Sequence, residues 1–183
     1  MALAPPGAAI AFEELIAAGA QQIIRVGTGG SLQPTVKPGE LVIATAAVQH
    51  TGYGREVTPE GYPAVADVML TLALAQAATQ QKAVTHTGLV LTRDAFYNGI
   101  IHAHTPDYAL ISQANVLAVE MECAALFLIG SLRRVHTAAI LAVDGYVLEQ
   151  AEDTETFGLM VAEKKTAIAA GHRHSHRQAF TTI

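Results

Sequence analysis

Hydrophobic runs and amphipathic segments alternate along the chain. Apolar residues recur at helical spacing, which predicts helices over residues 8–18, 63–80, 120–132 and 154–170. Short apolar runs bounded by glycine, proline and polar residues predict buried strands over residues 22–26, 41–48, 83–91, 116–119 and 136–143. Because helices alternate with buried strands, we expect an α/β fold of three layers, with a central mixed β-sheet flanked by helices.

Glycine, proline and polar residues mark the ends of these elements. Gly19 is expected to stop the first helix, and Val36–Gly39 predicts a turn. Pro63 is expected to open the second helix, since proline is tolerated in a first turn. The polar stretches 49–60 and 94–107 predict loops.

The composition fits a single domain over residues 1–183, of which 51% are hydrophobic and 15% charged. The net charge of −5 argues against a broad face for nucleic acid, although local basic residues could bind a small anion. Residues 1–20 lack the basic region of a secretory signal, and no apolar run reaches the roughly 20 residues that span a membrane. Cys123 stands alone, which excludes an intramolecular disulfide, and we expect a cytoplasmic protein.

Histidines alternate near the C-terminus, at His172, His174 and His176. A metal site needs ligands that converge on one point and further residues that orient them. We therefore expect no metal site there and interpret residues 171–183 as a frayed tail.

The first candidate for chemistry follows the predicted strand at 22–26. Arg25 lies at the end of that strand, and Thr28, Gly29 and Gly30 come soon after it. Glycines let backbone N–H groups turn toward an anion, and α/β folds place ligands at strand ends. Arg25 adds a planar charged donor and Thr28 a hydroxyl, so the segment predicts a phosphate site. An ordinary glycine turn, with Arg25 paired to a carboxylate, explains the segment equally well.

Two carboxylates, Glu120 and Glu122, flank Met121 where a buried strand gives way to a helix. A carboxylate is favoured near a helix N-terminus, which by itself could explain Glu120. A carboxylate also accepts hydrogen bonds from two adjacent hydroxyls, as the diol of a ribose requires. The turn is therefore a candidate sugar site.

Two further side chains could serve such a site. Asp144 follows the predicted strand at 136–143, and an acid there could donate a proton to a leaving group. A turn formed by Asp144 and Gly145 is the alternative explanation. Phe96, followed by Tyr97, could stack on a flat ligand or simply fill the core.

Taken in order, these segments resemble the nucleoside phosphorylase family, which includes uridine phosphorylases and hexameric bacterial purine nucleoside phosphorylases. The Val-Glu-Met-Glu run at 119–122 is similar to the family's ribose-binding signature and is the most specific match. Other segments are similar to its phosphate-binding strand and loop, to its base-stacking loop and to parts of uridine phosphorylases. These are residues 23–33, 92–97, 62–67 and 85–88.

The resemblance implies a pentosyltransferase that splits a purine nucleoside or uridine reversibly into free base and ribose 1-phosphate. Inorganic phosphate would be the co-substrate, with no other cofactor, and the chain would form a homo-oligomer, either a dimer or a trimer of dimers. The resemblance also implies the site residues. They are Arg25, Thr28, Gly29 and Gly30 for phosphate, Glu120, Met121 and Glu122 for ribose, Phe96 for the base, and Asp144 as the catalytic acid.

The chain departs from the family pattern in two places. Ile100 and His102 stand where uridine phosphorylases carry Gln and Arg, whereas Asp144 resembles the purine branch, so base specificity stays open with a lean to purines. The family also has an opening segment of several dozen residues before the point where this chain begins, so we expect a fold without the usual first strands. The alternative functions are a nucleosidase that hydrolyses the N-glycosidic bond and an inactive nucleoside-binding fragment.

Overall fold

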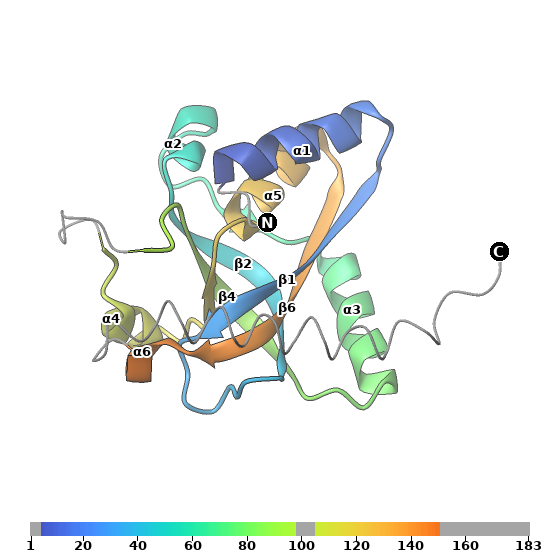
Figure 1. Cartoon of the computed structure of the whole chain (residues 1–183). Helices are drawn as coiled ribbons and strands as arrows, with labels where there is room; N and C mark the ends of the chain where they lie inside the picture. The colour runs from blue at the N-terminus through green and yellow to red at the C-terminus, as the bar shows by residue number, and fades with distance from the viewer. Residues whose placement is uncertain (1–4, 98–104, 151–183) are drawn as a thin grey trace. The chain divides into compact units, whose positions relative to one another are not determined.

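The computed structural model describes residues 5–97 and 105–150 (Figure 1). The chain divides into two units, Met1–Tyr146 and Val147–Ile183, and of the second unit only the short helix α6 (Val147–Gln150) is described. The helix expected over 154–170 and the tail expected over 171–183 lie outside the described residues. A single domain over residues 1–183 therefore stays a prediction.

Strands of the first unit form one mixed sheet in the order β3-β2-β4-β5-β1-β6. They are β1 (Gln22–Ser31), β2 (Leu41–His50), β3 (Ala64–Val65), β4 (Thr85–Arg93), β5 (Ala118–Glu120) and β6 (His136–Tyr146). Strand β2 also pairs with β6 in antiparallel orientation, so the strands other than β3 close into a ring. The predicted mixed sheet is confirmed, whereas nothing in the sequence pattern indicated its closure.

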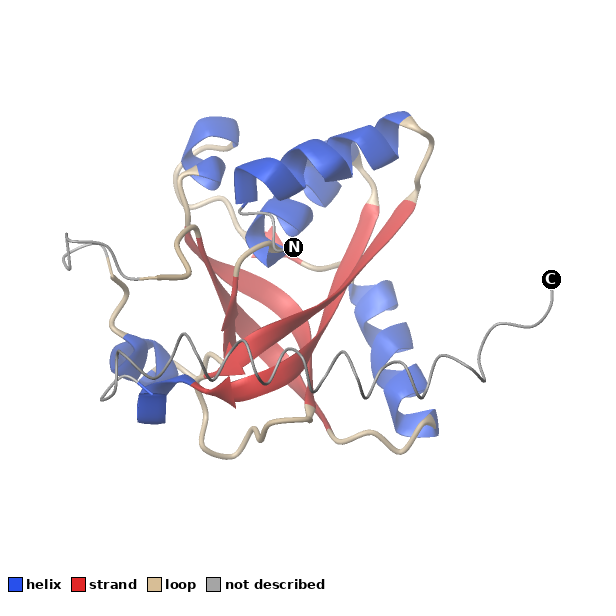
Figure 2. Ribbon diagram, in the orientation of Figure 1, coloured by secondary structure: helices blue, strands red, loops and turns tan. Residues whose placement is uncertain are grey.

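Helices flank this sheet, as expected (Figure 2). They are α1 (Pro5–Ala17), α2 (Tyr53–Val57), α3 (Val68–Gln80), α4 (Tyr108–Gln113) and α5 (Cys123–Arg133). Helix α5 contacts β2, β3, β4 and β6 and is covered by α1, whereas α3 contacts β2, β4 and β6. Among the described helices, none is long and apolar enough to cross a membrane.

The core lies where α5 meets the sheet. Helix α5 is apolar over most of its circumference, and all its residues from Cys123 to Gly130 are buried. Phe127 and Leu126 pack there with Val42 and Leu141 of the strands. Burying each large apolar side chain contributes roughly 1.5–3 kcal/mol, so the core fixes α5 firmly against the strand ends. The first turn of α5, which carries the two predicted glutamates, is therefore held in a defined place.

Three boundaries near the predicted site differ from expectation. Residues 27–31, predicted as a loop, continue β1 because they pair with β6 along their whole length. Strand β6 is longer in the same way, so Asp144 lies inside a strand rather than after one. Helix α5 begins at Cys123, because Glu120 is still paired with β4 as the last residue of β5.

The helix predicted over 63–80 begins at Val68 instead. The side chain of Asp67 accepts a hydrogen bond from the Leu70 N–H and so caps the helix at that point. The residues before it are held in extended form, because Ala64–Val65 pairs with β2 as the short strand β3.

The loop predicted over 49–60 contains the short helix α2, which its polar composition concealed, whereas α4 follows the loop predicted over 94–107, in a segment where no element was predicted. The expected end of the first helix is confirmed. Gly19 has a φ of +101°, a left-handed conformation that favours glycine after a helix C-terminus.

Gly130 tests the close packing of α5 against β6. A Cβ at this position would stand 2.5 Å from the Thr137 side chain and 2.9 Å from the Val135 carbonyl oxygen. We expect Gly130→Ala to lower the free energy of unfolding, measured in urea, by about 1–3 kcal/mol despite the higher helix propensity of alanine. Gly52→Ala is the control, because the nearest atom there is Asp94 Oδ2 at 3.7 Å, and it should change stability by less than about 0.5 kcal/mol. Equal effects would show that α5 shifts freely away from β6.

Candidate functional site

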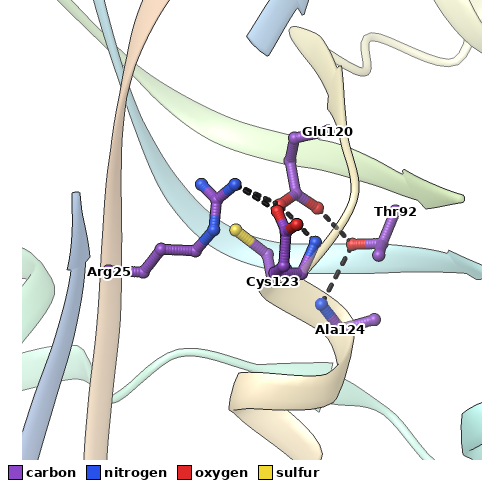
Figure 3. Close-up of polar contacts among 6 residues, drawn as sticks. Arg25, Thr92, Glu120, Cys123 and Ala124 are labelled. Carbon is purple, nitrogen blue, oxygen red and sulfur yellow. Dashed lines mark hydrogen bonds and ion pairs between the residues drawn. The ribbon is translucent and has the colours of Figure 1, made fainter. Parts of the chain in front are cut away.

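Three strands bring the predicted glutamates and arginine together. Strands β4 and β5 are parallel, with Thr92 opposite Glu120, and β1 runs antiparallel beside β5. The Arg25 side chain therefore reaches from β1 to the turn between β5 and α5 (Figure 3). Residues that lie almost a hundred positions apart, such as Arg25 and Glu122, meet at this turn.

Glu120 is held by hydrogen bonds within the protein, and its side chain is fully buried. Its Oε1 accepts a hydrogen bond from the Thr92 hydroxyl. Its Oε2 accepts from the backbone N–H groups of Glu122 at 2.8 Å and Cys123 at 2.9 Å, and Arg25 Nη2 lies 3.4 Å away. Both carboxylate oxygens thus bind the start of α5 and its surroundings, and an assisting role toward ribose stays a prediction.

Glu122 occupies the N-cap position of α5, yet its side chain does not cap the helix. Its Oε2 accepts a hydrogen bond from Arg25 Nη2 instead. Its Oε1 is buried without a hydrogen-bond partner among the described residues, and so is Arg25 Nη1. Each buried polar atom without a partner costs roughly 1–3 kcal/mol, so this pair marks a place where a ligand could supply the missing bonds.

Burial raises the pKa of Glu122, whereas the charge and hydrogen bond of Arg25 act in the opposite direction and Glu120 adds to the rise. The protein therefore disfavours the charged form of this carboxylate. A hydroxyl that donates to Glu122 would stabilise that form.

Two glycines of β1, Gly27 and Gly29, lie on the same face of the strand as Arg25. Gly27 leaves space for the Arg25 guanidinium, and Gly29 leaves space for the backbone of β5. A Cβ at Gly27 would stand 2.4 Å from Arg25 Nη1, so the guanidinium lies across this glycine. A Cβ at Gly29 would stand 2.9 Å from the Val119 carbonyl oxygen. Gly27 was not among the predicted site residues, and its spacing of two from Arg25 on a strand is the signal that could have found it.

Thr28 does not join Arg25. Burial alternates along β1, and Thr28 belongs to the exposed set, with Ile24 and Val26, on the opposite face. The predicted phosphate loop is wrong as a conformation, because the segment is a strand. Contacts of Thr28, Gly29 and Gly30 with phosphate stay predictions.

Asp144 lies at a β-bulge between β1 and β6. Gly29 pairs with Val143 and Gly30 with Gly145, so Asp144 is the extra residue. A bulge changes the direction of a side chain and is common beside functional sites. Asp144 is a partly buried residue, and its role as a catalytic acid stays a prediction.

Phe96 follows β4 and is 40% exposed, so its ring is open to a ligand. It contacts Tyr97 edge to face, with ring centroids 5.0 Å apart. Met121 is partly buried between the two glutamates. Their contacts with base and sugar stay predictions, and Ile100 and His102 lie outside the described residues.

A cavity of about 520 Å³ opens at the carboxyl ends of β2 and β4. Its walls include His50, Arg93 and Asp94 together with residues of α2 and the turn after it. None of the predicted site residues lines this cavity. Across residues 5–97 and 105–150, no group of three or more His, Cys, Asp or Glu side chains is arranged to hold a metal ion.

The raised pKa of Glu122 predicts how stability depends on pH. Folding favours the protonated form, so this stabilisation is present below the ordinary glutamate pKa of about 4.3 and is lost as the pH rises through the higher folded-state value. We expect urea unfolding to show the wild type losing stability relative to Glu122→Gln as the pH rises above about 4.3. A constant difference would mean that Arg25 fully offsets burial.

Asp67→Asn is the matched control, because its effect on stability should depend on pH in the opposite direction. Hydrogen bonds from His136 and from the Leu70 N–H lower the pKa of Asp67. The wild type should therefore lose stability relative to Asp67→Asn as the pH falls below about 3.9.

Known proteins match nearly the whole chain. A family model described as the phosphorylase superfamily matches residues 3–176. The uridine phosphorylase of Treponema pallidum is 41% identical over 172 residues, which are 90% of this chain and 66% of that protein. The purine nucleoside phosphorylase of Plasmodium vivax is 43% identical over 145 residues, which are 78% of this chain and 58% of that protein.

A solved structure shows the same fold. It is the P. knowlesi homolog of P. falciparum PNP, with a TM-score of 0.73 and 36% identity over 90% of this chain and 69% of that one. The chain spans about three fifths to two thirds of the length of the relatives it first matches. With a family model that covers almost all of its residues, the chain belongs to the phosphorylase superfamily.

Proposed function

We propose that the protein is a nucleoside phosphorylase, which converts a nucleoside and inorganic phosphate reversibly into free base and ribose 1-phosphate. Its relatives are named uridine phosphorylase and purine nucleoside phosphorylase, and one from Halorubrum lacusprofundi is named guanosine phosphorylase. The observation that carries the proposal is the buried pair without partners among the described residues, Glu122 Oε1 and Arg25 Nη1. An acceptor beside a cationic donor suits a sugar hydroxyl beside an anion.

Arg25 and Glu122 form one ion pair, in which each side chain would bind a different substrate. The bond between Arg25 Nη2 and Glu122 Oε2 holds both groups in place before any ligand arrives. Glu122 Oε1 then accepts a hydrogen bond from a ribose hydroxyl, and Arg25 Nη1 donates to an oxygen of phosphate. The backbone of Gly29 and Gly30 would add further donors, and Met121 would pack beneath the sugar.

The reaction forms a bond between a phosphate oxygen and C1′ of the ribose while the bond from C1′ to the base nitrogen breaks. Positive, oxocarbenium-like charge builds on the sugar, and the attacking phosphate stabilises it. The electron pair of the broken bond goes to the base, which Asp144 protonates as it leaves, while Phe96 contacts its face. Phosphate is the only co-substrate, and the protein would act in the cytoplasm as a homo-oligomer in nucleoside salvage.

Base release with and without phosphate tests the reaction type. We expect inosine, adenosine or uridine to lose its base only when phosphate is present, because phosphate is the nucleophile. Chromatography of the free base measures the rate. Release without phosphate would instead indicate a nucleosidase, and thermal stabilisation by a nucleoside without turnover would indicate a binding protein.

Gly27→Ala provides the matched variant for this assay. The new Cβ displaces the Arg25 guanidinium, so the KM for phosphate should rise about 10- to 100-fold, the value of a hydrogen bond to a charged group. Val26→Ala, which alters an adjacent side chain that is 78% exposed on the opposite face, should leave that KM unchanged. An unchanged KM in both variants would remove Arg25 from the phosphate site.

Asp144→Asn tests the catalytic acid. An amide cannot deliver the proton, so kcat/KM for inosine should fall by about 10²-fold or more, and that for uridine should fall less. Steady-state kinetics with both nucleosides measure the ratio. Equal losses would show that Asp144 does not protonate the base.

A further inference from the structure

The first backbone N–H groups of α5 find their partners outside the helix. Such groups have no partner within a helix and must be satisfied by other atoms when they are buried. The N–H groups of Glu122 and Cys123 donate to Glu120 Oε2, and the N–H of Ala124 donates to Thr92 Oγ1 at 2.9 Å. Strands β4 and β5 therefore cap this helix.

This arrangement changes what the N-cap residue does. An N-cap side chain normally accepts a hydrogen bond from the second or third N–H of its own helix. In α5 the second N–H belongs to Ala124, and it donates its hydrogen bond to the Thr92 hydroxyl. The Glu122 carboxylate makes no cap bond and pairs with Arg25 instead.

We propose that Thr92 is a positioning residue for the reaction, whose hydroxyl keeps Glu122 turned away from its own helix and toward Arg25. Thr92 is fully buried, and its Oγ1 donates to Glu120 Oε1 while it accepts from the Ala124 N–H. Its link to catalysis rests on the proposed function, whereas its effect on Glu122 stands on the geometry alone.

The position requires a group that donates and accepts at the same time. Serine retains both capacities, whereas valine has the same shape as threonine and neither capacity. In Thr92→Val, Glu120 Oε1 and the Ala124 N–H lose their shared partner in the core. The Glu122 carboxylate then becomes the acceptor for the Ala124 N–H, as in an ordinary N-cap, and leaves Arg25.

Carbon-13 NMR of the Glu122 carboxyl tests this change without any substrate. The signal is assigned by its loss in Glu122→Gln. We expect its pKa to rise in Thr92→Val, because the carboxyl exchanges the charged donor Arg25 for a neutral backbone N–H, and to stay near the wild-type value in Thr92→Ser. In the wild type Arg25, Glu120 and Cys123 face the carboxyl, and none of the three is substituted in the Thr92 variants. An unchanged pKa in Thr92→Val, or equal shifts in both variants, would overturn the proposal.

A double-mutant cycle separates positioning from general damage. We expect Thr92→Val to weaken inosine binding, measured by calorimetry, about tenfold in the wild type and to have little further effect in Glu122→Gln. Equal losses in both backgrounds would show that Thr92 acts on the fold and not through Glu122. If the wild type neither binds nor splits any nucleoside, the proposed function fails, and the NMR titration still decides whether Thr92 positions Glu122.

Discussion

The site depends on the need to satisfy the buried N-terminus of α5. The helix starts inside the core, where its first N–H groups cannot turn to solvent and must find protein acceptors. The carboxylate of Glu120 accepts hydrogen bonds from two of them, and the Thr92 hydroxyl accepts one from the next. The helix dipole also favours the negative charge of Glu120. Because these bonds join two strands to the helix, they also fix the direction in which Glu122 leaves the turn.

Local pattern was sufficient for most elements and insufficient for the strand that carries Arg25. Glycine-rich residues 27–31 are typical of a loop, since glycine is rare inside strands. The structure keeps them extended because they pair with β6, and glycine is needed there because Gly27 must admit the Arg25 guanidinium and Gly29 the backbone of β5. Both reasons concern atoms brought together by the fold, and the pairing with β6 links segments more than a hundred residues apart. Periodicity within a short window carries no information about such contacts.

The two glutamates show the same limit at the level of single side chains. Glu120 and Glu122 look equivalent in the sequence, and the pattern at 119–122 predicted the turn that carries them as a sugar site. Their environments differ because Glu120, and not Glu122, bonds to Thr92 and to the first N–H groups. One carboxylate therefore has partners for both oxygens, and the other keeps one oxygen without a partner among the described residues. Thr92 was not predicted as a site residue, because the residues next to it in the sequence do not indicate that it bonds to Glu120, 28 residues away.

Arg25 and Glu122 were predicted as members of two separate half-sites, yet they share one ion pair. A ligand that bonds to Glu122 Oε1 alters the electrostatic environment of Arg25, and an anion at Nη1 alters that of Glu122. The two buried atoms without described partners cost stability in the ligand-free protein. Burial also raises the pKa of Glu122 and so disfavours its charged form. A fold selected for stability alone would replace such a pair with groups that satisfy each other fully. That these atoms lie together at one turn, beside the buried start of α5, is the physical reason to propose that sugar and phosphate bind there.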